Sequence, residues 1–275
     1  MEHQEFNFRY KQYELFAQYW KTQNMRAAVV LVHGMGEHST RYTDYVIPEL
    51  LKNGIAVLTF DNFGHGKSSG KRGHCPGYEA IMELVDQMLA KAKALFENVP
   101  LFLYGHSMGG NVVINYTLRH KPQIVGTIAT SPFLKLAFQP PGWKISIGKL
   151  LQRIAPSITL PTELEVEAIS KDVSEVNKYK EDPLVHDRIS PNFSFPVMEA
   201  GEWALSKAGE LEAPMLLLHG TADRIIDHKA TAEFNEKAGN ASLKLYEGGY
   251  HELHNDEEKE KLLEDIVNWI NVKLQ

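Results

Sequence analysis

Short, continuous hydrophobic runs alternate with longer amphipathic stretches along most of this chain. Runs of this kind are typical of strands that are buried on both faces of a sheet. They occur at Ala27–Val32, Ile55–Phe60, Leu101–Tyr104, Ile124–Ala129, Met215–Leu218 and Leu243–Tyr246. The helix-length stretches between them are Tyr42–Asn53, Tyr78–Glu97, Gly110–His120, Lys229–Ala238 and Asp256–Leu274. Strands that alternate with helices predict an α/β fold with a mostly parallel central sheet flanked by helices on both faces.

The chain departs from this alternation in two places. At the amino end, alternating hydrophobic and polar residues at Glu5–Arg9 and Tyr13–Trp20 predict an antiparallel hairpin. Between residues 133 and 195, no run has the character of a buried strand, and prolines recur. This part contains helix-length segments at Trp143–Ile154 and Glu163–Lys171.

The length of the chain and the return of the alternation indicate its domain organisation. A chain of 275 residues can form one large domain or a core with an inserted lid. Because strands and helices alternate again afterwards, we interpret residues 133–195 as an inserted, mainly helical cap. The core would then consist of a first part, residues 1–132, and a second part, residues 196–275.

Composition and charge narrow the functional classes. Hydrophobic residues make up 43% of the chain and charged residues 23%, which excludes disordered and fibrous proteins. The net charge of −6 offers no basic face, so we expect no nucleic-acid partner. Cys75 is the single cysteine, so an intrachain disulfide is excluded. No apolar run is long enough to span a membrane or to serve as a secretory signal, and the expected location is cytoplasmic.

A candidate catalytic serine lies between a buried run and the helix that follows it. Residues 105–109 read Gly-His-Ser-Met-Gly, in which the glycines let a strand turn sharply into a helix and expose the serine. At such a turn the serine backbone is strained, and the helix dipole favours developing negative charge. The five-residue pattern alone is weak, because a plain glycine turn can produce it. The strand before it and the helix after it favour Ser107 as a nucleophile.

A catalytic serine needs a histidine as base and a carboxylate that orients the histidine. With this type of serine turn, the acid follows a late strand and the histidine follows the last one. Asp223 lies in the loop after the run at Met215–Leu218; Asp227 in the same loop is the alternative but fits better as a helix cap. His251 lies just after a glycine turn that follows the last run, with His254 as the alternative.

Backbone N–H groups must stabilise the oxyanion of a tetrahedral acyl-transfer intermediate. We expect one from Met108, after the candidate nucleophile, and one from Met35, in the glycine-containing loop after the first buried run. Asp61–Gly70 contains glycines and a Lys-Ser pair but lacks the spacing of a phosphate-binding loop. No metal-binding spacing of histidines or cysteines occurs. We therefore expect neither a metal nor an organic cofactor.

With these residues in place, the sequence resembles the monoglyceride lipase family, which includes bacterial lysophospholipase-like hydrolases of the serine aminopeptidase S33 type. The motifs that carry the resemblance are His33–Tyr42, Gly64–Ser68, Gly105–Gly110, Gly220–Arg224 and Tyr246–His254. The resemblance covers nearly the whole chain and implies an α/β-hydrolase fold. It implies Ser107, Asp223 and His251 as the catalytic triad. It also implies Met35 and Met108 as oxyanion donors.

The resemblance implies hydrolysis of a monoacylglycerol to a fatty acid and glycerol through an acyl-serine intermediate. It adds a polar pocket for the glycerol, formed by Glu37, Arg41, Tyr179 and His254. The alternative for Glu37 and Arg41 is a surface ion pair at a helix start. Met35 stands where the animal enzymes have a smaller alanine. The other functions that these residues allow are a lysophospholipase, a short- or medium-chain carboxylesterase, a cofactor-free haloperoxidase and a non-catalytic lipid-binding module.

The cap has a charge pattern of its own, with no acidic residue between Ser131 and Thr162. The basic residues of this stretch are Lys135, Lys144, Lys149 and Arg153. The hydrophobic residues that would share one helix face are Trp143, Ile147, Leu150, Leu151 and Ile154. Two interpretations fit: transient docking on a membrane or lipid surface, and packing over the active site as a lid. The expected partner is a small lipid ester, and the sequence carries no signal for an oligomeric state.

Overall fold

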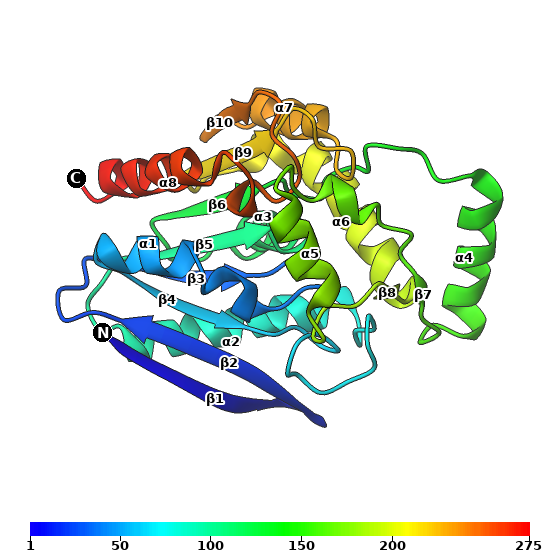
Figure 1. Ribbon diagram of the computed structural model, residues 1–275, viewed down its shortest axis with the longest axis horizontal. Helices are drawn as coiled ribbons and strands as arrows, with labels where there is room; N and C mark the ends of the chain where they lie inside the picture. Colours follow the sequence, from blue (N-terminus) through cyan, green and yellow to red (C-terminus); the bar gives the residue numbers. More distant parts are fainter.

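The computed structural model describes residues 1–275 and contains a central eight-stranded sheet in the order β1-β2-β4-β3-β5-β6-β9-β10. The strands of this sheet are β1 (Glu2–Tyr10), β2 (Tyr13–Lys21), β3 (Ala27–Val32), β4 (Ile55–Phe60), β5 (Leu101–His106), β6 (Gly126–Thr130), β9 (Met215–Gly220) and β10 (Ala241–Tyr246). β1 and β2 form the expected antiparallel hairpin, β2 pairs antiparallel with β4, and all other neighbours are parallel. The predicted mostly parallel sheet is therefore confirmed (Figure 1).

Helices cover both faces of the sheet. They are α1 (Val46–Lys52), α2 (Tyr78–Leu95), α3 (Met108–His120), α6 (Pro191–Lys207), α7 (His228–Lys237) and α8 (Lys259–Lys273). Val29 and Leu31 of β3 pack in one hydrophobic core with α1 and α8. Val30 and Val32 pack in the other core with α2, α3, α6 and α7. Because successive side chains of a strand point to opposite faces, a fully hydrophobic strand fills both cores.

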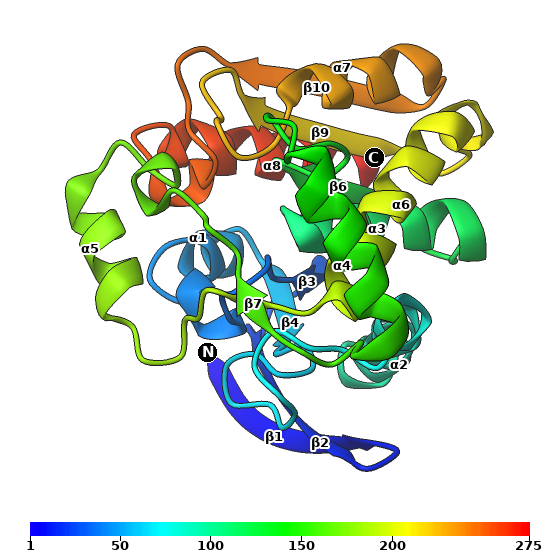
Figure 2. The same ribbon diagram turned by 90° about the vertical axis from the view of Figure 1, so that its right-hand side faces the viewer.

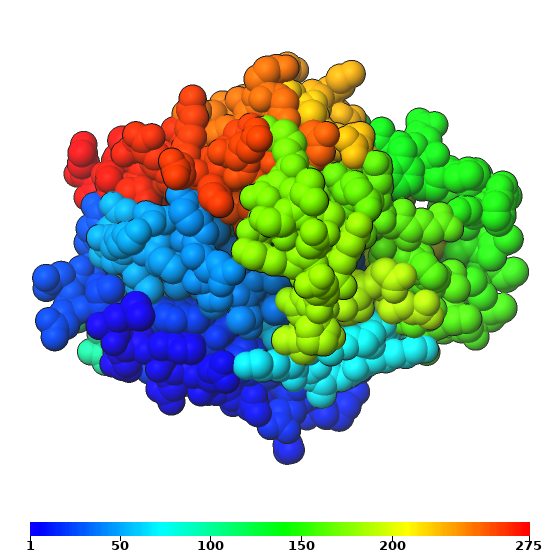
Figure 3. Space-filling view, viewed as in Figure 1, coloured from blue at the N-terminus to red at the C-terminus, as the bar shows by residue number.

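A long insertion between β6 and β9 carries elements that do not join the sheet. They are α4 (Gly142–Ile154), β7 (Leu160–Pro161), η2 (Val166–Ala168), α5 (Val173–Glu181) and β8 (Arg188–Ile189). Val176 and Tyr179 of α5 pack against Ile225 and Ile226 of the core. α4 stands at the right-hand edge of the molecule in Figures 1 and 3 and contacts α6, and Figure 2 looks onto this edge with α4 in front. The boundary that we placed at residue 195 falls within α6, so the division of the chain into core and cap stays a prediction. No helix combines the length and the hydropathy that crossing a membrane requires.

The helix expected at Glu163–Lys171 is wrong, because this segment contains only the short 3-10 turn η2. Its backbone is engaged elsewhere. The carbonyl groups of Ala168 and Ile169 accept hydrogen bonds from the N–H groups of His251, at 3.4 Å, and Glu252, at 2.7 Å. These carbonyl groups bind a loop of the core instead of helical N–H groups, and the helix of this region, α5, begins further along the chain.

Candidate active site

Ser107 lies at the turn between β5 and α3. Its backbone has φ 53° and ψ −114°, in a region that strains any residue with a side chain. A Cβ atom built on Gly105 would lie 2.2 Å from the Gly109 carbonyl oxygen. A Cβ atom on Gly109 would lie 2.0 Å from the carbonyl oxygen of Val32 in β3. The glycines of Gly-x-Ser-x-Gly are therefore required by the close approach of β3, β5 and α3.

Ser107, His251 and Asp223 form a continuous hydrogen-bonded chain. His251 Nε2 lies 2.9 Å from Ser107 Oγ, and His251 Nδ1 lies 2.7 Å from Asp223 Oδ2. A carboxylate beside Nδ1 fixes the proton there, so that Nε2 can accept the serine proton. The N–H groups of Ile225 and Ile226 donate to Asp223 Oδ1 at 2.8 and 3.0 Å and hold the carboxylate in place. The structure thus brings together three predicted residues from turns after β5, β9 and β10.

Burial and neighbouring charge have opposite effects on the pKa values of His251 and Asp223. Burial lowers the pKa of His251, but the Asp223 carboxylate more than offsets it, and the pKa lies above that of an ordinary histidine. Burial raises the pKa of Asp223, yet His251 and His219 together bring it well below the usual aspartate range. An ionised carboxylate therefore lies beside a histidine that can gain a proton, as general base catalysis requires.

His219 belongs to the site and was not predicted. It is fully buried at the end of β9, with Nε2 3.0 Å from Asp223 Oδ2 and Nδ1 2.8 Å from Thr231 Oγ1. Burial lowers the pKa of His219, so its ring is neutral and donates to the carboxylate through Nε2. The sequence signal that could have revealed His219 is its position. It lies at the end of the strand before the loop of Asp223, four residues ahead of that aspartate.

The two alternatives for the acid and the base lie elsewhere. Asp227 accepts a hydrogen bond from the Lys229 N–H at 2.9 Å and caps α7, as expected for an aspartate just before a helix. His254 is fully buried and stacks on Tyr42 with the ring centres 4.9 Å apart, and neither of its ring nitrogens has a hydrogen-bond partner. Neither residue forms a hydrogen bond with Ser107.

The two segments that are expected to supply oxyanion donors both lie beside Ser107. Met108 is the first residue of α3, where helical N–H groups have no partner within the helix. Met35 follows Gly34 in the turn after β3, and a Cβ atom built on Gly34 would lie 3.3 Å from Ser107 Cβ. A side chain at this position of the turn would therefore contact the serine, and the backbone of the turn lies close to Ser107. The roles of both N–H groups stay predictions.

The four residues expected in a glycerol pocket lie together. Glu37 accepts a hydrogen bond from the Tyr42 hydroxyl at 2.8 Å and pairs with Arg41 at 3.0 Å. Arg41 lies over the ring of Tyr179, with Cζ 4.7 Å from the ring centre, and His254 stacks on Tyr42. The alternative of a surface ion pair is wrong, because the side chains of Glu37 and Arg41 are only 3% and 7% exposed.

Glu252 completes this network and was not predicted. Its carboxylate oxygens lie 2.6 Å from Arg41 Nη1 and 2.8 Å from Arg41 Nη2. It directly follows His251 in the sequence, but nothing in the local pattern indicates that it binds an arginine from the opposite end of the chain.

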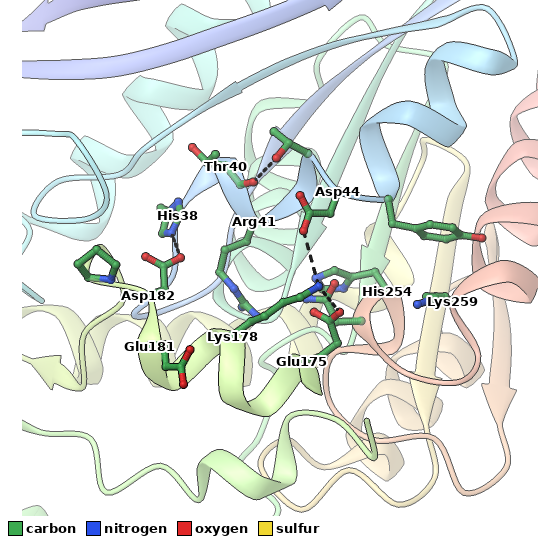
Figure 4. A pocket seen from close by; sticks show the side chains of 14 residues that line it. His38, Thr40, Arg41, Asp44, Glu175, Lys178, Glu181, Asp182, His254 and Lys259 are labelled. Atoms are coloured by element: carbon green, nitrogen blue, oxygen red, sulfur yellow. Dashed lines mark hydrogen bonds and ion pairs between the residues drawn. The ribbon is translucent and has the colours of Figure 1, made fainter. Parts of the chain in front are cut away.

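A polar cleft of about 640 Å³ borders the same network (Figure 4). It lies between α5 and the short 3-10 turns η1 (Ser39–Tyr42) and η4 (Leu253–Asn255), and Arg41 and His254 line it. Ser107 does not line this cleft. No group of three or more histidine, cysteine, aspartate or glutamate side chains is placed to hold a metal ion.

A serine at a strand–helix turn, joined to a histidine and an aspartate from the ends of later strands, defines a serine hydrolase of the α/β-hydrolase class. The family model described as "Serine aminopeptidase, S33" matches residues 23–258. The chain belongs to this family, together with the monoglyceride lipases that its sequence resembles. The predicted fold class and family are thereby confirmed.

The relatives include enzymes that match along most of their length. A monoacylglycerol lipase from Mycolicibacterium smegmatis is 30% identical over 89% of this chain and 88% of its own length. The crystal structure of a monoacylglycerol lipase from Paleococcus ferrophilus has a TM-score of 0.87 and 37% identity, and the match covers 94% of this chain and 99% of that one. An abhydrolase domain-containing protein from Dictyostelium discoideum is 38% identical over 90% of this chain, which spans 27% of that protein.

Proposed function

We propose that this chain hydrolyses monoacylglycerols to a fatty acid and glycerol. The observation that carries the proposal is the hydrogen-bonded chain Ser107–His251–Asp223 next to the buried polar network of Glu37 and Arg41. The first provides the chemistry of ester cleavage, and the second suits a small leaving group rich in hydroxyls. The monoacylglycerol lipases from M. smegmatis and P. ferrophilus, which are similar to this chain over most of its length, support the same substrate class.

In the first half-reaction, Ser107 Oγ attacks the ester carbonyl carbon while His251 Nε2 takes the hydroxyl proton. Asp223 keeps the other imidazole proton on Nδ1 and stabilises the imidazolium that forms. The N–H groups of Met35 and Met108 donate to the oxyanion. The carbon–oxygen bond to glycerol then breaks, His251 gives its proton to the leaving oxygen, and an acyl-serine remains.

In the second half-reaction, a water molecule attacks the carbonyl carbon of the acyl-serine, and His251 Nε2 takes one of its protons. The bond to Ser107 Oγ breaks, the proton returns to this oxygen, and the fatty acid leaves. One ester and one water are consumed, and one fatty acid and one glycerol are formed. Every proton transfer in this sequence passes through His251.

On the alcohol side, we assign recognition of the glycerol to Glu37, Arg41, Tyr179 and His254. A Cβ atom built on Gly34 would lie 2.8 Å from Glu37 Oε1 and 3.3 Å from Ser107 Cβ, so the network begins next to the serine. Both ring nitrogens of His254 are buried without a partner. A buried polar group without a hydrogen bond is costly, and a hydroxyl-bearing ligand would relieve that cost.

Substrate comparison tests this proposal. We expect the highest kcat/KM on 1-oleoylglycerol, compared with 1-oleoyl-lysophosphatidylcholine and with p-nitrophenyl esters of graded chain length. Ser107→Ala should lower kcat by at least about 1,000-fold. Cleavage of the lysophospholipid but not of the monoacylglycerol would make the chain a lysophospholipase. Cleavage of the p-nitrophenyl esters alone would make it a carboxylesterase.

The same variant tests the functions of other classes. A fluorophosphonate probe should label the unmodified protein and fail to label Ser107→Ala, because the probe reacts with an activated serine. A protein that the probe does not label would be a non-catalytic lipid-binding module. Peroxide-dependent halogenation without ester turnover would indicate a haloperoxidase.

We also propose that α4 docks transiently on a membrane or lipid surface, where the substrate resides. The hydrophobic side chains of α4 that are at least half exposed are Trp143, Ile147, Leu150 and Ile154, whereas Leu151 is half-buried. The opposite side of α4 faces α6, because a Cβ atom on Gly148 would lie 2.8 Å from the Phe195 ring. Packing as a lid therefore leaves the apolar face uncovered. Lys149 and Arg153 are exposed and can interact with anionic lipids.

A further inference from the structure

Arg41 lies between two buried carboxylates. Its Nη1 lies 3.0 Å from Glu37 Oε2 and 2.6 Å from Glu252 Oε1, and its Nη2 lies 2.8 Å from Glu252 Oε2. Glu252 thus binds the guanidinium with both carboxylate oxygens. This planar two-point geometry makes a strong pair between an arginine and a carboxylate. The ring of Tyr179 covers one face of the guanidinium. The charged end of Arg41 is therefore bound within the protein on three sides.

The network contains more negative than positive charge. Burial raises the pKa of Glu252, but the Arg41 guanidinium outweighs burial and lowers this pKa to about 2. Glu37 accepts hydrogen bonds from Arg41, from the Tyr42 hydroxyl and from a backbone N–H, as a carboxylate does. Burial lowers the pKa of His254, so the imidazole of this network is neutral. One guanidinium therefore balances only one of two carboxylates.

This charge lies on the side of Ser107 where the proposed function places the leaving alcohol. The place that a Cβ atom of Gly34 would occupy is 2.8 Å from Glu37 Oε1 and 3.3 Å from Ser107 Cβ, so Glu37 lies near the serine. Glu252 directly follows His251. An alcohol with a phosphate would bring further negative charge into a buried region, where water and salt screen charges weakly. A glycerol hydroxyl brings no charge and can donate hydrogen bonds to the carboxylates.

We propose that Glu252 determines the head-group specificity of this enzyme. It neutralises Arg41, and the second carboxylate then makes the alcohol pocket accept uncharged polyols and exclude alcohols that carry a phosphate. Glu252 acts through Arg41 and is a positioning residue. Without the charge of Glu252, Glu37 alone would balance Arg41, and the Nη1/Nη2 edge that Glu252 occupies would be held less firmly and could bind a phosphate, as arginine does well. The inference rests on the proposed ester hydrolysis at Ser107 and deepens it.

The test compares 1-oleoylglycerol with 1-oleoyl-lysophosphatidic acid, which have the same acyl chain and differ by one phosphate on the alcohol. Glu252→Gln removes the charge and keeps the size of the side chain, and Glu252→Asp keeps the charge. Glu260→Gln makes the same chemical change at an exposed carboxylate of α8 and is the matched control. The ratio of kcat/KM for the phosphate ester to that for 1-oleoylglycerol cancels any general loss of activity.

We expect this ratio to rise by about tenfold or more in Glu252→Gln. In Glu252→Asp and Glu260→Gln it should stay within about twofold of the unmodified enzyme. An unchanged ratio in Glu252→Gln overturns the inference. Should that variant not fold, the unmodified enzyme still decides, because equal kcat/KM on the two esters contradicts an anion-excluding pocket.

A second measurement does not require turnover of monoacylglycerol. Glycerol 3-phosphate is tested as an inhibitor of p-nitrophenyl butyrate hydrolysis, and its inhibition constant should fall by about tenfold or more in Glu252→Gln. If this constant shifts while 1-oleoylglycerol is not cleaved, the proposed substrate is wrong and the role of Glu252 stands. If 1-oleoylglycerol is cleaved and the constant does not shift, the inference about Glu252 is wrong and the proposed function stands.

Discussion

His219 Nε2 lies 3.0 Å from Asp223 Oδ2, the same carboxylate oxygen that lies 2.7 Å from His251 Nδ1. One oxygen thus faces two imidazoles, while the other oxygen accepts hydrogen bonds from two backbone N–H groups. Four contacts hold this buried carboxylate ionised and in one orientation. The strength of the hydrogen bond between Asp223 and His251 therefore depends on His219.

Replacing His219 with alanine should weaken catalysis although all three proposed triad residues remain. The hydrogen bond from His219 lowers the pKa of Asp223, so its loss makes the carboxylate more basic and raises the pKa of His251. Protonated His251 cannot act as a base, so the acid limb of kcat/KM against pH should move to higher pH. The value of kcat at neutral pH should fall by about tenfold.

His219→Gln serves as the control for the previous change, because a glutamine can still donate a hydrogen bond to Asp223. Its acid limb should lie between those of the unmodified enzyme and His219→Ala. An acid limb that stays in place in the alanine variant, in a protein that is still folded, contradicts the coupling of His219 to His251.

Asp223→Asn should lower kcat by about 10,000-fold, because an amide does not hold the proton of His251 on Nδ1. Asp227→Asn removes a carboxylate from the same loop but leaves a residue that caps helices well, so its activity should stay within about twofold. Steady-state hydrolysis of p-nitrophenyl butyrate measures both. Equal losses in the two variants would mean that the integrity of the loop, and not the carboxylate of Asp223, limits the reaction.

Glu252 should make the stability of the protein depend on pH in the acid range. Its pKa is about 2 in the folded protein, against 4.5 for an ordinary glutamate, so ionisation favours the folded state. This contribution is present above the pKa of the unfolded chain and is lost as the pH falls through the folded-state pKa. The free energy of unfolding in urea should therefore fall less steeply from about pH 5 to about pH 3 in Glu252→Gln. Equal slopes would refute this.

Gly109→Ala should destabilise the fold by about 3 kcal/mol or more, because the added Cβ would lie 2.0 Å from the Val32 carbonyl oxygen. Gly239→Ala is the matched control, since a Cβ there meets no atom within 4 Å. That variant should keep its free energy of unfolding within about 1 kcal/mol. Thermal or urea unfolding gives both values, and similar values for the two variants would contradict the packing argument.

Replacing Trp143 and Leu150 with serine should reduce cosedimentation with phosphatidylcholine–phosphatidylserine vesicles by about tenfold. Each replacement removes apolar area from the exposed face of α4. Lys149→Glu should weaken binding only when the anionic lipid is present. Val272→Ser, an exposed position on α8, is the control and should bind as the unmodified protein does. Binding that survives in the α4 variants would leave α4 with the role of a lid alone.

The parts of the fold and site that could be predicted from the sequence depend on local patterns. A strand such as β3 is hydrophobic throughout because it is covered on both faces. The turn at Ser107 needs glycines that are close together in the chain, and Asp223 follows a strand that is buried throughout as β3 is. His251 follows the edge strand β10, which is only partly buried and contains Lys244, but a glycine turn marks its end. Each of these signals lies within a window of a few residues.

The buried partners of these residues could not be predicted, because their signals are not local. Glu252 pairs with Arg41 across 211 residues, and only the folded sheet brings them together. The helix expected at Glu163–Lys171 was wrong for the same reason. The carbonyl groups of Ala168 and Ile169 bind the loop that carries His251, so a segment with helical composition does not form the helix expected there.

The backbone of Ser107, with its positive φ, makes stability and activity favour different residues at position 107. A side chain in such a conformation costs about 1–3 kcal/mol, and a glycine there would carry no such cost. Screening variants of this chain for heat resistance alone would therefore enrich glycine at position 107, which also removes the hydroxyl. A descendant released from the need to hydrolyse esters would be expected to lose this serine early and to become more stable by losing it.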